Sequence, residues 1–129
     1  MMKILGILMV LLAVLIAGCR AQAVTPTANA SLMIDMQVEP DPAAVGEAVL
    51  SVTVTDAAGQ PVTDAAISAR GDMSHAGMAP VLAAATENDG GVYRIPFTWT
   101  MGGDWFVEIT VTRPDGSTVS QRFDLTVQS

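Results

Sequence analysis

YRIPFTWTMGGDWFVEITV, residues 93–111, is the stretch that decides the fold. Apolar side chains alternate with polar ones on both sides of the pair Gly102-Gly103. A period of two is typical of strands with one buried face, and paired glycines mark a turn. The stretch therefore predicts two successive β-strands, with Trp99 and Trp105 at core-facing positions.

Shorter alternating runs flank this stretch on both sides. Turn signals rich in Pro, Gly, Asn and Asp separate the runs at intervals typical of an immunoglobulin-like sandwich. We therefore predict an all-β domain, a seven-stranded immunoglobulin-like β-sandwich over residues 32–129 that follows an N-terminal signal peptide. The Ala-rich fourth run is expected to be an edge strand. The seven predicted strands lie within residues 32–38, 49–55, 65–70, 81–86, 93–99, 105–111 and 123–127.

Residues 1–18 differ in composition from the rest of the chain, so the two parts are considered separately. The first 18 residues contain 15 apolar side chains and one charge, whereas 50 of the other 111 residues, or 45 %, are apolar. Those 111 residues carry 5 Arg against 13 acids, a net charge of −8, and no Lys. An acidic surface argues against nucleic acid as a partner, and the length leaves room for one domain. A multidomain enzyme, a coiled coil and a disulfide scaffold are excluded.

The N-terminus has the three parts of an export signal. Lys3 supplies the positive start, and the uncharged run 4–17 has 14 residues, fewer than the roughly 20 that a spanning helix needs. The tetrad IAGC that ends at Cys19 resembles the lipobox of bacterial lipoproteins. This resemblance implies that residues 1–18 are a lipoprotein signal peptide and that the Cys19 thiol receives a diacylglyceryl group. The alternative is a free cysteine in an uncleaved anchor.

Residues 19–31 are then the lipidated cysteine and a flexible tether, because the residues after Cys19 are small and polar with one Pro. We expect a protein exported to the bacterial cell envelope and lipid-anchored there, on the periplasmic or extracellular face, with the membrane as one partner. Lipidation of the single cysteine leaves no thiol for catalysis, disulfide formation or zinc binding.

Residues 71–80, GDMSHAGMAP, break the strand pattern and contain the only histidine, His75. Met73 and Met78 lie on either side of it. Thioether sulfur is a soft ligand and imidazole a borderline one, so this set favours Cu(I), with Cu(II) binding through His75 and a carboxylate such as Asp72. Zinc fits less well, because structural zinc sites use Cys, His and carboxylate.

Strand geometry suggests how these ligands converge. In an extended segment Met73 and His75 face the same side, and Gly77 permits the turn that returns Met78 toward them. If each strand crosses the sandwich once, loops 40–47, 71–79 and 100–103 share one end. Met101 then joins Met73, His75 and Met78 as a candidate copper ligand, and the tether enters at the opposite end.

Each of these residues also has a purely structural interpretation. Methionines fill irregular gaps in protein cores, and a single histidine such as His75 is commonly solvated. Met33 and Met36 are assigned to the first strand as structural residues. Trp99 or Trp105 would cover a bound ion by a cation–π contact, but their alternating positions favour core packing.

The order of these motifs resembles the YtkA-like domain, which is related to FixH-type proteins. The resemblance covers residues 32–127 and implies a small immunoglobulin-like envelope domain, found alone, as a lipoprotein or attached to metal-efflux adaptors. It also implies a role in copper handling, with a copper-transport or oxidase-assembly protein as partner. The motifs are strand 49–55, turn 56–62, Met73-x-His75-x-x-Met78-x-Pro80, Gly91-x-Tyr93, Met101-x-Gly103-x-Trp105 and a closing strand.

No catalytic arrangement is apparent, so we predict that the protein is not an enzyme. Ser74 adjoins His75, but neighbouring side chains on an extended segment point apart. The carboxylates fall mainly in turns, at Asp56, Asp64, Asp89 and Asp115. Two hypotheses remain: a lipid-anchored domain that binds or delivers copper through the Met/His loop, and an immunoglobulin-like scaffolding or partner-binding module without metal.

Overall fold

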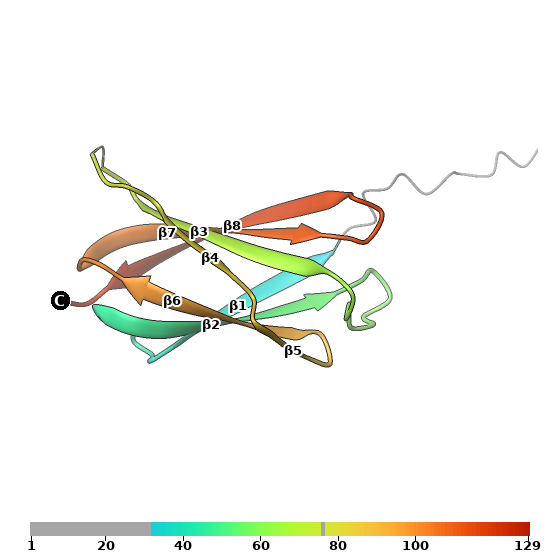
Figure 1. Cartoon of the computed structure of the whole chain (residues 1–129). Coiled ribbons are helices and arrows are strands. Elements are labelled where there is room, and N and C mark those ends of the chain that lie inside the picture. Colours follow the sequence, from blue (N-terminus) through green and yellow to red (C-terminus); the bar gives the residue numbers. More distant parts are fainter. Residues whose placement is uncertain (1–31, 76) are drawn as a thin grey trace, which may run out of the picture.

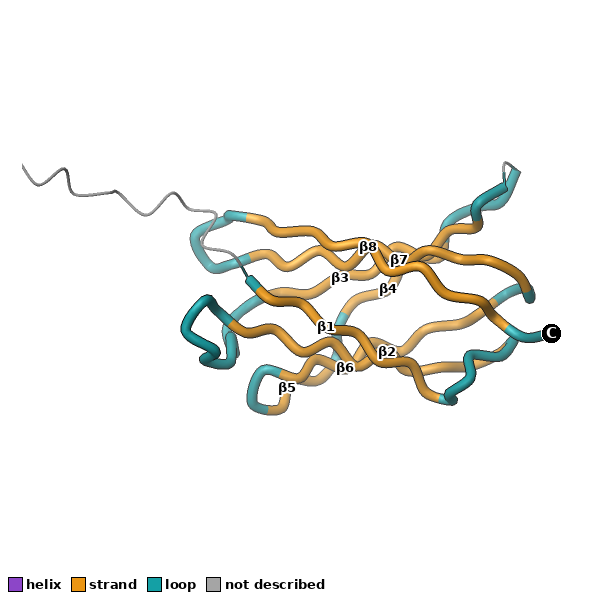
Figure 2. Tube along the Cα trace, turned by 180° about the vertical axis from the view of Figure 1, so that it is seen from behind, coloured by secondary structure: helices purple, strands orange, loops and turns teal. Residues whose placement is uncertain are grey.

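The computed structural model describes residues 32–75 and 77–129, which form two antiparallel four-stranded sheets packed face to face (Figures 1 and 2). One sheet has the order β1-β2-β6-β5 and the other β4-β3-β7-β8. The predicted signal peptide, Cys19 and the tether lie outside the described residues. The strands are β1 Met33–Glu39, β2 Gly46–Thr55, β3 Ala66–Met73, β4 Val81–Ala84, β5 Glu87–Asp89, β6 Val92–Trp99, β7 Gly103–Thr112 and β8 Thr118–Val127.

The prediction of an all-β sandwich is correct, but the count of seven strands is wrong: there are eight among the described residues. The predicted run 81–86 changes sheets at its end. The Ala85 N–H donates to the Ile67 carbonyl on β3 at 3.0 Å. The next N–H, from Thr86, donates to the Arg94 carbonyl on β6, also at 3.0 Å. The chain then continues as β5, whose three residues are polar and exposed. Such a strand has no apolar alternation, so its sequence resembles a turn.

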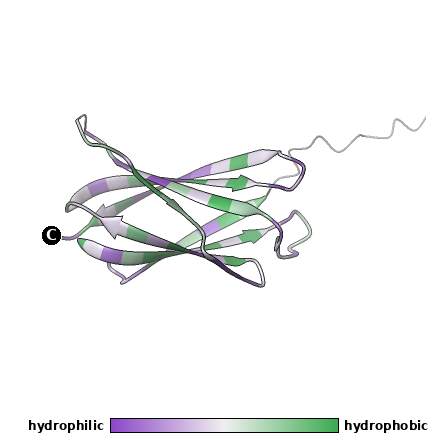
Figure 3. Cartoon of the chain, in the orientation of Figure 1, coloured by the Kyte–Doolittle hydropathy of each residue, from purple (hydrophilic) through white to green (hydrophobic). Residues whose placement is uncertain are grey.

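The core lies between the sheets and follows from the alternation of the strands, which is visible as stripes of hydropathy in Figure 3. Trp99 and Trp105 lie in the part of the core next to the turn between β6 and β7, with their rings edge to face and centroids 5.3 Å apart. β4 is an edge strand, as predicted. No helix in the described part of the chain is long and apolar enough to cross a membrane. The largest fully buried side chains are Trp99, Trp105, Leu50, Ile95, Ile109, Val52, Val54, Val107, Val111 and Val127.

The strand registers define the two ends of the sandwich. Met73 is opposite Trp105 and Gly103 is opposite Val127, so the loop after β3, the turn before β7 and the chain's C-terminus share one end. Met33, at the start of β1, is opposite Thr55 at the other end. Figure 1 shows this separation along the long axis. The end formed by residues 73–75, 77–80 and 100–103 is called the Met/His end below.

Candidate metal centre

Met73 is the last residue of β3, and its side chain is buried, 8 % exposed, on the core face. It is opposite Trp105 in the ladder between β3 and β7. Its methyl carbon reaches the β6–β7 turn, since a Cβ added at Gly103 would lie 2.9 Å from it. Met73 therefore connects the core with the turn that carries Met101.

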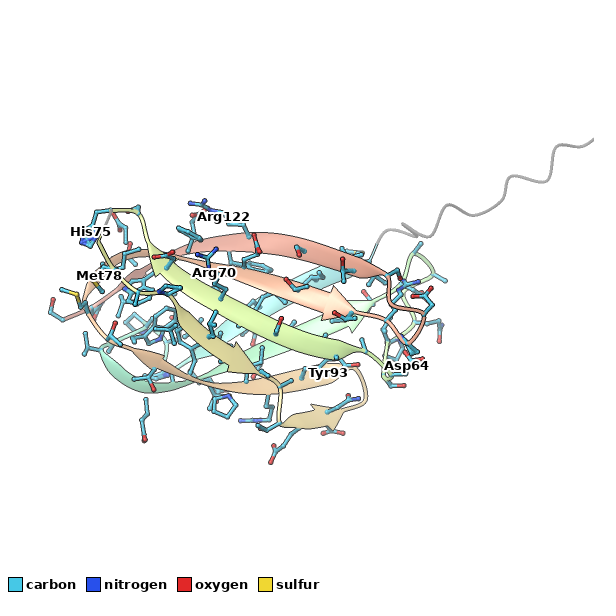
Figure 4. The ribbon with its side chains drawn as sticks, turned by 45° about the horizontal axis from the view of Figure 1, so that its top comes forward. Asp64, Arg70, His75, Met78, Tyr93 and Arg122 are labelled. Atoms are coloured by element: carbon cyan, nitrogen blue, oxygen red, sulfur yellow. The ribbon has the colours of Figure 1, made fainter. Side chains whose placement is uncertain are left out.

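His75 and Met78 lie on the loop after β3, at the same end of the sandwich (Figure 4). β3 ends at Met73 and the chain bends at Ser74, so the extended segment from which a shared face for Met73 and His75 was predicted stops before His75. His75 is exposed, whereas Met78 is half-buried and packs against the core. Gly77 has a φ of 101°, which permits the reversal of the chain expected there.

Met101 lies in the turn between β6 and β7 and is 45 % exposed. The buried Trp105 holds this turn, because its indole Nε1–H donates to the Met101 carbonyl at 2.9 Å. Trp99 is fully buried and packs against Phe97, with ring centroids 4.7 Å apart. Both tryptophans are therefore core residues, as their alternating positions predicted.

The donor atoms at the Met/His end are three thioether sulfurs and one imidazole, graded from the exposed His75 and Met101 to the buried Met73. Asp72, the carboxylate considered for Cu(II), has other partners: Oδ2 lies 3.5 Å from Arg70, and Oδ1 accepts the Met73 N–H at 2.9 Å. Within residues 32–75 and 77–129, no group of three His, Cys, Asp or Glu side chains is placed to hold a metal. A metal at this end would therefore depend on thioether sulfur, which favours Cu(I).

The comparisons with known proteins agree with this architecture. The family model described as YtkA-like matches residues 29–110, almost two thirds of the sequence. The chain belongs to the YtkA-like family. No curated protein matches this YtkA-like chain.

Two solved structures share the sandwich fold with the YtkA-like chain. The PmoD soluble domain from Methylocystis sp. ATCC 49242 (Rockwell) is 17 % identical, with a TM-score of 0.50 over 74 % of this chain and 90 % of that one. The Lin-41 filamin domain is 16 % identical, with a TM-score of 0.52 over 72 % of this chain and 91 % of that one. At these identities the likeness establishes an immunoglobulin-like fold alone.

Two carboxylates that the sequence placed in turns, Asp56 and Asp115, stabilise turns in the YtkA-like sandwich. Asp56 Oδ1 accepts the backbone N–H groups of Ala58 at 2.9 Å and Gln60 at 3.0 Å. Asp115 Oδ1 accepts the Ser117 hydroxyl at 2.6 Å and the Ser117 N–H at 2.8 Å. These hydrogen bonds hold the pKa of Asp115 below its usual value, and the bond from the Ser117 hydroxyl contributes most. Both carboxylates therefore stabilise turns.

Replacing Gly103 with alanine is expected to displace the Met73 methyl group and to destabilise the domain by about 1–3 kcal/mol. The reason is twofold: φ at Gly103 is 131°, and the new Cβ would lie 2.9 Å from the Met73 methyl carbon. The Met73 signal in a methyl NMR spectrum measures the displacement. Gly116→Ala is the matched control, since Gly116 has a φ of 86° but no atom within 4 Å of an added Cβ. An unchanged Met73 methyl signal in Gly103→Ala would contradict this contact.

Proposed function

We propose that this YtkA-like domain is exported, lipid-anchored through Cys19, and binds copper at the Met/His end for delivery to a copper-transport or oxidase-assembly protein. One observation carries the proposal. The end of β3 and two separate loops of a well-packed sandwich bring the donor-bearing residues Met73, His75, Met78 and Met101 to the same end.

The chemistry of these donors supports Cu(I) over Cu(II) as the cargo. Thioethers are neutral, soft ligands that prefer Cu(I), and unlike thiolates they do not form disulfides in an oxidising compartment. The carboxylate that would favour Cu(II), Asp72, is occupied by Arg70 and by the Met73 N–H. Mature residues other than Cys19 offer no thiol that would compete for the metal.

The graded burial of the ligands suits delivery rather than permanent storage. His75 and Met101 are exposed, so ligands from a receiving protein could reach the metal there. Met78 and Met73 are anchored against the core and would keep their positions during such an exchange. A site of this kind holds the copper ion through few ligands. It releases the ion when ligands of the receiving protein replace them.

The position of the Met/His end relative to the start of β1 suits a protein anchored to a membrane through its N-terminus. β1 starts at the end opposite the Met/His end. A chain attached to a membrane through Cys19 would therefore direct its copper ligands away from the lipid surface, toward a partner in the envelope.

Titration of residues 20–129 with Cu(I) and, separately, with Cu(II), against a competing chelator, tests the proposal. We expect Cu(I) to bind more tightly than Cu(II), and His75→Ala combined with Met78→Ala to weaken Cu(I) binding at least about tenfold. Met33→Ala is the matched control, because Met33 is 68 % exposed and lies at the opposite end. Equal Cu(I) affinity of the wild type and the double variant would reject the copper function and favour a partner-binding module without metal.

A further inference from the structure

β4 has an open edge on the side away from β3. It is the outermost strand of its sheet, and the Ala85 N–H that follows it donates to the Ile67 carbonyl on β3 at 3.0 Å. In an antiparallel ladder, alternate residues direct both their N–H and C=O to the same side. Leu82 and Ala84 therefore direct theirs away from β3, where no strand of the described chain pairs with them.

A hollow of about 510 Å³ lies beside this edge, between β4 and β6. Figure 1 shows the two strands side by side before the chain turns into β5. β5 pairs with β6 only as far as Arg94, so beyond that point Pro96 and Thr98 have no strand on this side among the described residues. The hollow therefore lies where the edges of both sheets are open, and it is called the β4 hollow below.

The lining of the β4 hollow is mainly apolar. Val81 and Ala83 are half-buried and pack against the core, whereas Leu82 is 73 % exposed. An apolar side chain beside Leu82 would cover much of this exposed surface. The seven apolar residues among the ten that line the hollow are Ala48, Val49, Val81, Leu82, Ala83, Pro96 and Phe97.

Two carboxylates, Glu39 and Glu47, complete the lining together with Thr98. Both glutamates are exposed. Glu39 lies 3.8 Å from Arg94, and within residues 32–75 and 77–129 Glu47 has no ion-pair partner. A lysine or arginine fits such a site, because its aliphatic stem covers apolar surface while its charged head reaches a carboxylate. The β4 hollow is therefore complementary to a long basic side chain.

We propose that β4 binds an extended segment of a partner protein in which apolar residues alternate with lysine or arginine. Such a segment would add to the sheet by pairing with the outward N–H and C=O groups of Leu82 and Ala84. Its apolar side chains would lie beside Leu82, and its basic side chains would enter the β4 hollow toward Glu47. The contact is short, so we expect a dissociation constant in the micromolar to millimolar range.

Charge favours a basic partner over a second copy of this chain. The residues after 18 carry a net charge of −8 and no lysine. The charged side chains of β1, the other open strand of the first sheet, are Asp35 and Glu39. Two acidic chains would repel each other at the β4 hollow, whereas a basic segment would be attracted to it.

The binding of a partner segment at β4 goes beyond the proposed copper function and does not depend on it. β4 begins directly after the loop that carries His75 and Met78, so a partner held there would lie next to the Met/His end. Neither the open edge nor the β4 hollow requires a metal. Peptide binding measured without copper and copper binding measured without peptide therefore fail separately.

NMR titration of the full chain in a mild detergent, without copper, tests the proposal with two model peptides, VKVKVKV and VEVEVEV. We expect VKVKVKV to bind with a dissociation constant below about 1 mM and to shift the amide signals of Leu82, Ala84 and Thr98. VEVEVEV is expected to leave these signals unchanged. Failure of VKVKVKV to bind, equal binding of both peptides, or shifts confined to β1 or β8 would overturn the proposal.

Charge reversal tests the role of the two glutamates. We expect E39K/E47K to weaken the binding of VKVKVKV at least about tenfold and to bind VEVEVEV instead. D35K is the matched control, because Asp35 is an exposed acid on β1 that does not line the β4 hollow. Equal affinity of E39K/E47K and D35K for VKVKVKV would contradict recognition of the basic side chains by these glutamates.

Two further measurements test the pairing with β4 without changing a charge. A84P removes an N–H that faces away from β3, so we expect it to keep the fold and to weaken VKVKVKV binding at least about fivefold. In the wild type, hydrogen exchange of the Leu82 and Ala84 amides should slow when VKVKVKV is bound. Unchanged exchange at both amides would contradict the pairing. Slower exchange at higher protein concentration without peptide would identify a second copy as the occupant and overturn the proposal.

Discussion

Replacing Trp105 with alanine is expected to lower the free energy of unfolding by about 3–5 kcal/mol, the usual cost of removing a large aromatic side chain from a core. Trp105 is 2 % exposed and packs edge to face against Trp99. Its indole also donates to the Met101 carbonyl, so the substitution removes the hydrogen bond that holds the β6–β7 turn. Denaturant unfolding followed by circular dichroism measures the change.

Two controls separate packing from hydrogen bonding at this position. Trp105→Phe keeps most of the aromatic contact but cannot donate to Met101, so we expect a smaller loss than in Trp105→Ala. Leu82→Ala removes a side chain that is 73 % exposed and should change stability by less than about 0.5 kcal/mol. A loss below about 1 kcal/mol in Trp105→Ala would contradict the contribution of this buried side chain to core packing.

Replacing Met101 with leucine is expected to weaken Cu(I) binding about tenfold or more while leaving the fold intact. Leucine has a similar volume but no sulfur, and Met101 is 45 % exposed, so packing changes little. Competition with a Cu(I) chelator measures the affinity. Met33→Leu is the matched control, since it removes an exposed thioether from the opposite end.

The Met101→Leu prediction tests the topology of the proposed copper site as well as its ligand chemistry. Met101 belongs to a different loop from His75 and Met78, and only the fold brings the two loops to one end. If Met101→Leu bound Cu(I) as tightly as Met33→Leu, the binding site would be confined to the loop after β3 or would lie elsewhere.

The pattern of apolar alternation predicted most of the fold. Leu50, Val52 and Val54 on β2 and Val107, Ile109 and Val111 on β7 are all buried, as a period of two requires. β5 was not predicted, because a strand of exposed polar residues is held by backbone pairing to β6 alone. The change of sheet at Ala85 and Thr86 depends on partners that are distant in sequence, so no local signal identifies it.

The candidate site was predicted less completely than the fold. The alternation of loops between the two ends placed Met101 with the Met/His loop, and the registers agree with that placement. The prediction that Met73 and His75 share a face assumed strand geometry past the point where β3 ends. The support that Trp105 gives to the Met101 turn was missed as well. The only sequence signal for it is the spacing of four residues between them.

X-ray absorption at the copper edge, on residues 20–129 loaded with one equivalent of Cu(I), tests the central claim most directly because it identifies the ligand atoms. We predict a first shell dominated by sulfur, together with one imidazole nitrogen, and a loss of sulfur scattering when Met78 and Met101 are both replaced by leucine. A first shell of nitrogen and oxygen alone, unchanged by those substitutions, would contradict a copper site at the Met/His end.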